Sequence, residues 1–114
     1  MELHKMKKYI VNELENNYNI IIKFEWDVNK NYSNVRKHEI SFEEAKTVFL
    51  DDYAIVFDDP EHSVEEERFL ILGLSLIKNI LIVSHCYKKE EEIIRIISAR
   101  KATKKEIAFY YNRR

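Results

Sequence analysis

The sequence contains one cysteine, one glycine and one proline among its 114 residues, and it has no long hydrophobic run. The lone Cys86 excludes a disulfide within the chain and fits a reducing cytoplasm, where we expect the protein to reside. Its apolar surroundings favour a small buried side chain over a reactive nucleophile. The longest nearly unbroken apolar run, Phe69–Ile77, is too short to cross a membrane, and no secretory leader opens the chain.

Several catalytic signatures are also missing. The sequence has no glycine-rich phosphate loop, no paired Cys/His spacing and no Ser-His-Asp order. His62 and His85, with acids scattered around them, do not form a credible metal site, so we expect neither a metal nor a cofactor. Apolar residues make up 46% of the chain and charged residues 34%, which is typical of one small domain with a single core.

Charge is unevenly distributed, although the net charge is only −1. Residues 39–67 hold eleven acids against Lys46 alone, whereas residues 88–114 hold nine bases against four acids. This asymmetry predicts an acidic face and a basic face, and the basic face would suit phosphate. Pairing of the two segments within the fold would explain the pattern equally well.

Periodicity predicts helices and strands in a segregated order. Apolar residues three or four apart predict an amphipathic helix over 1–18, and Ser41 and Thr103 each precede a capping-box pattern. The remaining elements are a strand over 20–27, helices over 29–38, 42–50 and 104–112, and strands over 53–58, 67–75, 79–87 and 93–101. Short connections between the later strands predict an α+β fold, a small antiparallel sheet with helices packed against it and an extra N-terminal helix.

Five separated motifs occur together in this order. They are WDxxK at 26–30, NxxKH at 34–38, SFEEA at 41–45, EERF at 66–69 and RIISAR at 95–100. As a set they resemble the BrnT family of toxins from type II toxin–antitoxin systems, over about Lys23–Tyr111. The resemblance leaves residues 1–22 as an N-terminal helical extension and 23–114 as the toxin domain. Where the family usually has glycine after the NxxKH histidine, this chain has Glu39.

The resemblance implies a RelE-like fold and metal-independent endoribonuclease activity. It also implies neutralisation by a BrnA-type antitoxin in a hetero-oligomer, whose DNA-binding part represses the operon. Metal-free RNA cleavage proceeds by attack of the ribose 2′-OH on the adjacent phosphate. This reaction needs a base, an acid and cations around the phosphorus.

Arg68 and Arg100 are the leading candidates for binding the scissile phosphate, because the planar guanidinium makes bidentate contacts with phosphate oxygens. For Arg68 the alternative is a salt bridge to Glu65–Glu67. Alternation along the strand places Arg95 and Arg100 on opposite faces, so we expect one of them to reach a given site. Arg95 is therefore expected to support RNA binding or to pair with Glu90–Glu92.

The proton-transfer candidates are histidines, which titrate near neutrality. His38 follows Arg36 and Lys37 at a helix end and would act either as a base or as a helix cap. His85 lies on an apolar strand, where a buried, hydrogen-bonded histidine is the common outcome. His62, in an acidic loop, and His4 are expected at the surface.

Lys30 is the remaining catalytic candidate, since the WDxxK spacing places it near the sheet. Trp26 could stack on a base or fill the core, and Tyr110 could stack or pack. Ser98, Lys101 and Lys104 complete the predicted RNA-binding set. The alternative to an enzyme is a catalytically weak binding module that co-represses transcription with its antitoxin.

Overall fold

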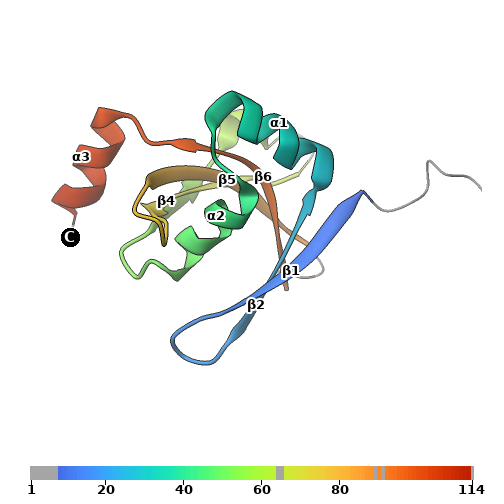
Figure 1. Cartoon of the computed structure of the whole chain (residues 1–114). Coiled ribbons are helices and arrows are strands. Elements are labelled where there is room, and N and C mark those ends of the chain that lie inside the picture. Colours follow the sequence, from blue (N-terminus) through green and yellow to red (C-terminus); the bar gives the residue numbers. More distant parts are fainter. Residues whose placement is uncertain (1–7, 64–65, 89, 91, 114) are drawn as a thin grey trace, which may run out of the picture.

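The computed structural model describes residues 8–63, 66–88, 90 and 92–113 and contains one six-stranded sheet with three α-helices packed against it (Figure 1). The elements are β1 (Tyr9–Glu15), β2 (Ile21–Asp27), α1 (Val28–His38), α2 (Phe42–Lys46), the 3-10 helix η2 (Thr47–Leu50), β3 (Ile55–Asp58), the 3-10 helix η3 (Pro60–His62), β4 (Phe69–Leu74), β5 (Ile80–Lys88), β6 (Ile93–Lys101) and α3 (Lys104–Asn112). The α+β prediction is confirmed.

The strands lie in the order β1-β2-β6-β5-β4-β3. Four neighbouring pairs are antiparallel, as expected, but β2 pairs with β6 in parallel over Lys23–Glu25 and Ile93–Arg95. The predicted antiparallel sheet is therefore a mixed one. None of the described helices is long and apolar enough to span a membrane.

The predicted N-terminal helix is wrong for the described residues. Tyr9–Glu15 forms a strand that pairs with all of β2, from Tyr9 opposite Asp27 to Glu15 opposite Ile21. The Asn16 side chain accepts hydrogen bonds from the backbone N–H groups of Tyr18 and Ile20, and Asn19 has φ 61°, so asparagines build the hairpin turn. Residues 1–7 of the predicted helix lie outside the described residues, and the boundary at residue 22 stays a prediction.

The core lies mainly between the sheet and the helices α1 and α2, on what we call the helix face. Phe24, Trp26, Phe42, Ile96 and Ala99 are among its fully buried members. On the opposite face, which we call the pocket face, Tyr110 of α3 packs on Leu72 and Ile82. Each face of the sheet is therefore partly covered, and the uncovered part of the pocket face lies beside α3.

A bulge in β6 changes which side chains share a face. Ser84 pairs with Ser98, but the next residue of β5, His85, pairs with Ile96, so Ile97 is an extra residue. One extra residue inverts the alternation beyond it. Cys86, Ser84 and Ile82 therefore lie opposite Arg95, Ser98 and Arg100 on one face. The prediction that the two arginines point to opposite sides is wrong, because simple alternation does not apply across a bulge.

The end of α1 is fixed against the part of β6 that β2 does not cover. The buried Asn34 side chain donates to the carbonyl of Ala99 at 2.8 Å and accepts from its N–H at 3.0 Å. Its amide thus makes the two backbone hydrogen bonds that a neighbouring strand would otherwise make. It also donates to the carbonyl of Ile40. Glu39, which lies between Asn34 and Ile40 in the sequence and ends α1, adopts φ 60°, a left-handed conformation that glycine takes without strain. This arrangement carries His38 to the edge of β6.

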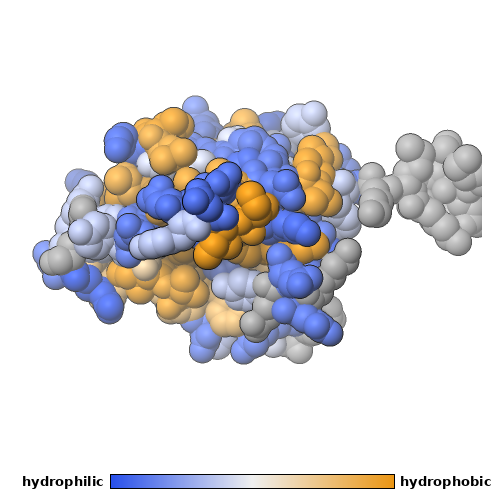
Figure 2. Space-filling view, turned by 90° about the horizontal axis from the view of Figure 1, so that it is seen from below, coloured by the Kyte–Doolittle hydropathy of each residue, from blue (hydrophilic) through white to orange (hydrophobic). Residues whose placement is uncertain are grey.

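Both outer strands expose apolar side chains. On β1 these include Ile10 and Val11, and on β3 they include Val56 and Phe57. Seen from below, hydrophobic side chains form separate patches among hydrophilic ones rather than a single continuous surface (Figure 2).

Candidate active site

A pocket of about 310 Å³ opens on the pocket face between the β3–β4 connection, β6 and the end of α1. Leu70 and Ile82 supply apolar parts of its lining, and Ser84 and Ser98 supply hydroxyls. Its charged and titratable residues come from three parts of the chain, the end of α1, the β3–β4 connection and β6: His38, Asp59, Glu61, His62, Arg68 and Arg100. The structure thus brings together Arg68, Arg100, His38 and Ser98, which the sequence predicted for the site.

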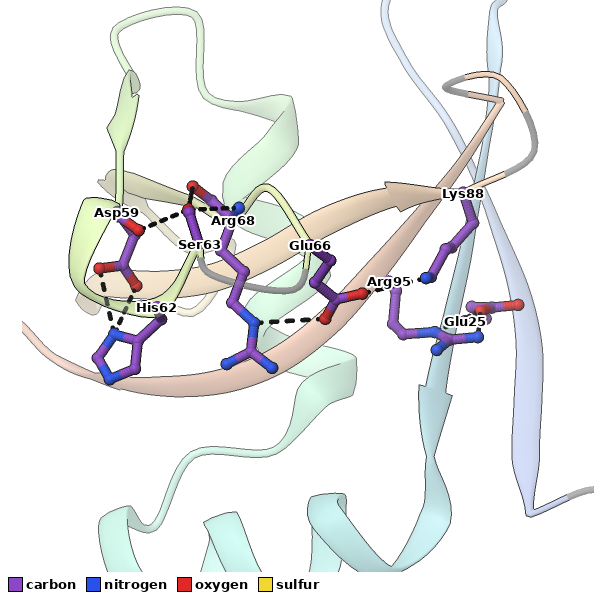
Figure 3. A network of polar contacts seen from close by, with 8 residues as sticks. All are labelled: Glu25, Asp59, His62, Ser63, Glu66, Arg68, Lys88 and Arg95. Atoms are coloured by element: carbon purple, nitrogen blue, oxygen red, sulfur yellow. Dashed lines mark hydrogen bonds and ion pairs between the residues drawn. The ribbon is translucent and has the colours of Figure 1, made fainter.

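Arg68 lies immediately before β4 and is held by its neighbours. Its Nε donates to Glu66 at 3.3 Å, and Lys88 contacts the same carboxylate at 3.1 Å (Figure 3). The hydrogen bond from Lys88, assisted by the one from Arg68, lowers the pKa of Glu66. Arg68 therefore combines the predicted salt bridge with a place in the pocket.

Arg100 makes a bidentate ion pair with Glu106 of α3, with Nη1 and Nη2 at 2.8 and 2.9 Å from its two carboxylate oxygens. Glu106 also accepts from the backbone N–H of Thr103 and completes the predicted capping box. The hydrogen bond from Arg100 lowers the pKa of Glu106 to about 2, and the same pairing raises the pKa of Arg100. The guanidinium keeps its charge and is oriented by the helix start.

His62 and Asp59 form a pair that the sequence did not predict, although His62 is exposed, as expected. Nδ1 of His62 lies 3.1 and 3.2 Å from the two carboxylate oxygens of Asp59, whose side chain is 12% exposed (Figure 3). Pro60 begins the short helical turn between them, which places residues three apart on one side. The Asp-Pro-x-His spacing was the signal available in the sequence.

The ends of this connection are tied together by Ser63. Its hydroxyl donates to the carbonyl of Asp59 at 2.7 Å and accepts from the N–H of Arg68 at 2.9 Å, while the N–H of Asp59 donates to the carbonyl of Arg68. Figure 3 shows the imidazole of His62 and the guanidinium of Arg68 extending in the same direction. The backbone therefore holds a histidine beside an arginine.

A second hollow of about 260 Å³ continues the pocket along α1. It shares His38, Ile97 and Ser98 with the first, and it is also lined by Lys30 and Lys37. Lys30 thus lies near the predicted site but in the adjoining hollow, and Lys37 was not predicted. Together the two hollows form a groove with basic side chains along its length.

Two of the predicted RNA-binding residues are buried, which corrects their assignment. Trp26 is 1% exposed and packs edge-on against Phe42, so neither face of its indole is open to a base. Tyr110 is also 1% exposed, and its hydroxyl donates to Asp51 at 2.5 Å. Both side chains therefore pack inside the protein, which was the alternative to stacking on a base.

Apart from Ser98, which lines the pocket, the remaining predicted RNA-binding residues lie outside its described lining. Arg95 is on the same face, where it pairs with Glu25 at 2.5 Å and lies over the ring of Tyr9 at 4.4 Å. Glu91, part of the run expected to pair with Arg95, lies outside the described residues. Lys101 and Lys104 are exposed on the segment after Arg100.

His85 is fully buried on the helix face beside Phe49, Phe69 and Tyr87. Burial lowers its pKa to about 4, although the hydrogen bond between Nδ1 and the carbonyl of Val83 opposes this. Cys86 is buried as well, and burial raises the pKa of its thiol. The predictions that His85 is a buried, hydrogen-bonded histidine and that Cys86 is a small buried side chain are therefore confirmed.

Comparison with known proteins agrees with this architecture. The crystal structure of the Brucella abortus ribonuclease toxin BrnT is similar, with a TM-score of 0.53 and 23% sequence identity over 69% of this chain and 94% of that chain. At this identity the likeness shows the fold alone. No curated protein matches the chain. A model of the family described as "Ribonuclease toxin, BrnT, of type II toxin-antitoxin system" matches residues 26–106. The chain therefore belongs to the BrnT family of ribonuclease toxins of type II toxin–antitoxin systems.

Proposed function

We propose that the protein is a metal-independent endoribonuclease that cleaves RNA by attack of a ribose 2′-OH on the adjacent phosphate. The observation that carries this proposal is the convergence of Arg68, Arg100 and His38 on one pocket from three separate parts of the chain. Two guanidinium groups can bind the two non-bridging oxygens of a phosphate. They stabilise the extra negative charge of the phosphorane more than that of the ground state.

The adjoining hollow gives the RNA backbone a path. Lys30 and Lys37 line it along α1, and His38 and Ser98 belong to both hollows. The lysines bind flanking phosphates as point charges, so binding weakens steeply as salt rises. His38, exposed at the junction, transfers a proton to or from the reacting oxygens.

We also propose a BrnA-type antitoxin that covers this groove and masks its cations, in a hetero-oligomer that represses its operon through the antitoxin. The RelE-like classification belongs to the same proposal. A non-catalytic co-repressor is the second candidate. It is favoured by the pairing of Arg68 with Glu66 and of Arg100 with Glu106, because RNA must compete with these carboxylates.

The test is cleavage of a short fluorescent RNA by the purified chain, with EDTA present throughout. We expect products that end in a 2′,3′-cyclic phosphate, and no cleavage where the scissile ribose is 2′-deoxy. Arg68→Ala and Arg100→Ala should each lower kcat by about 10²-fold or more. Arg113→Ala, directly after α3 and against Phe109, is the matched control and should cleave normally.

Intact RNA with the folded wild-type protein would contradict the enzymatic proposal and support the co-repressor. Cleavage that is lost in EDTA and restored by a divalent metal would contradict metal independence alone. Expression without a partner gives a cellular readout: growth arrest should occur with the wild type and be relieved by Arg100→Ala.

A further inference from the structure

We infer that His62, oriented by Asp59, is a catalytic residue of this pocket and is the group that accepts the proton of the attacking 2′-OH. The inference rests on the proposed ribonuclease function. It assigns a role to two residues that the sequence motifs did not place in the site. Its basis is the paired geometry of the side chains and their position beside Arg68.

The hydrogen bond fixes which ring nitrogen is available. A carboxylate can only accept, so in neutral His62 the proton lies on Nδ1, which faces both oxygens of Asp59 at 3.1 and 3.2 Å. Nε2 then carries the free lone pair and is the atom that can receive a proton. Since the carboxylate of Asp59 is largely buried, it holds this orientation in place without being fully solvated.

The surroundings of His62 suit the start of an in-line reaction. Its imidazole is 59% exposed and lines the pocket, so RNA can reach it. The charged or titratable groups that share the pocket are Asp59 and Glu61 from its own segment, Arg68 from the start of β4, Arg100 from β6 and His38 from α1. A phosphate held by the two arginines would lie between histidines contributed by separate elements.

The step balances without a co-reactant. Nε2 of His62 takes the proton of the 2′-OH while the O2′–P bond forms and the P–O5′ bond breaks. The leaving 5′-oxygen receives a proton from His38, which gives a 2′,3′-cyclic phosphate and a 5′-hydroxyl. Solvent then removes the proton from His62 and returns one to His38. Asp59 is a positioning residue, because it acts only through the imidazole.

The experiment compares His62→Gln, Asp59→Asn and the control Asp58→Asn in single-turnover cleavage across pH. Asp58 is the adjacent acid, is exposed at the end of β3 and lies outside the described lining of the pocket. We expect His62→Gln to lower the rate by about 10²-fold or more and to remove one limb of the pH–rate profile. Binding of a 2′-O-methyl RNA should be unchanged. Asp58→Asn should match the wild type.

A second measurement needs no RNA. The ¹⁵N shifts of the His62 ring should report the Nδ1–H tautomer in the wild type. Asp59→Asn should increase the Nε2–H tautomer, because an asparagine amide can donate to Nδ1. Asp59→Asn should also cleave more slowly than Asp58→Asn.

The outcomes separate the two proposals. Wild-type rates in His62→Gln, or both limbs retained in its pH–rate profile, would overturn the role of His62 while the ribonuclease function stands. A wild-type protein that cleaves nothing contradicts the proposed function first. A folded His62→Gln that loses RNA binding together with activity would make His62 a binding residue and would also overturn the inference.

Discussion

Replacing Glu106 by glutamine should separate the charge of the Arg100–Glu106 pair from its shape. Glutamine can still accept the hydrogen bond from the Thr103 N–H, as glutamine does in other capping boxes, so the start of α3 keeps its cap. What is lost is the negative charge opposite the guanidinium. The perturbation reaches the core, because α3 carries the buried Tyr110 that packs on Leu72 and Ile82.

The lowered pKa of Glu106 sets the size of the effect. A shift from 4.5 to about 2 corresponds at face value to about 3 kcal/mol, since each pKa unit represents 1.36 kcal/mol. The side chains are 41% and 29% exposed for Arg100 and Glu106, so solvent screening reduces that figure. Exposed ion pairs contribute about 0.2–1 kcal/mol, and bidentate geometry adds to this. We therefore expect Glu106→Gln to lose about 1–2 kcal/mol of unfolding free energy at pH 7.

The pH dependence gives the decisive readout. Because the folded-state pKa of Glu106 is depressed, its contribution is fully present above the unfolded value of 4.5 and is lost as pH falls through about 2. Urea unfolding of the wild type and Glu106→Gln should therefore differ at pH 7 and converge toward pH 2. Glu15→Gln, an exposed site on β1, controls for the change in net charge. A difference that is the same at pH 7 and at pH 2.5 would refute the electrostatic reasoning.

Three further predictions concern the scaffold. Asn34→Ala should lose at least about 2 kcal/mol, because it leaves the N–H and C=O of Ala99 without their partner, and urea unfolding with an unchanged m-value checks this. Gly73→Ala should lose about 1–3 kcal/mol in the same assay, because its Cβ would meet Val48 Cγ1 at 2.8 Å; unchanged stability would show that β4 shifts freely. In the wild type, stability should fall as the pH drops from 6.5 to 4, because His85 binds a proton in the unfolded chain but stays neutral in the folded one. His85→Phe should make this fall less steep in thermal melts recorded across pH. An equally steep fall in the variant would show that another group causes the acid sensitivity.

Most of the fold could be predicted from local patterns, because caps, turns and short connections act over a few residues. Ser41 and Thr103 cap helices where the sequence placed them. The predicted N-terminal helix failed because apolar residues spaced three or four apart over 1–18 fit one helical stripe. Over the described residues 8–18 the outcome depends on pairing with β2, and no pattern within the segment reports its partner.

The site was harder to predict because it depends on register. Simple alternation along β6 would place Arg95 and Arg100 on opposite faces, but the extra residue Ile97 puts them on the same face. The motifs identified Arg68, Arg100 and His38 correctly as neighbours in space. They did not identify His62 as a pocket residue, because its position depends on the turn at Pro60 and on the partner that this turn provides.

The uneven charge of the sequence leads neither to fully separate acidic and basic faces nor to general pairing of the acidic segment with the basic one. Among the pocket-face cations that the structure describes, Lys88 and Arg68 meet the acidic segment, and both do so through Glu66. Arg95 and Arg100 instead pair with Glu25 and Glu106, which lie outside residues 39–67. The Arg68–Glu66 and Arg100–Glu106 pairs are partly exposed, and such pairs are weak, whereas Glu25, the partner of Arg95, is only 13% exposed. Under the proposed function, an RNA phosphate would have to displace the partly exposed carboxylates Glu66 and Glu106 from Arg68 and Arg100. The ion pairs therefore allow a folded chain of net charge −1 to gather basic side chains on one face, the face to which the proposed function assigns phosphate binding.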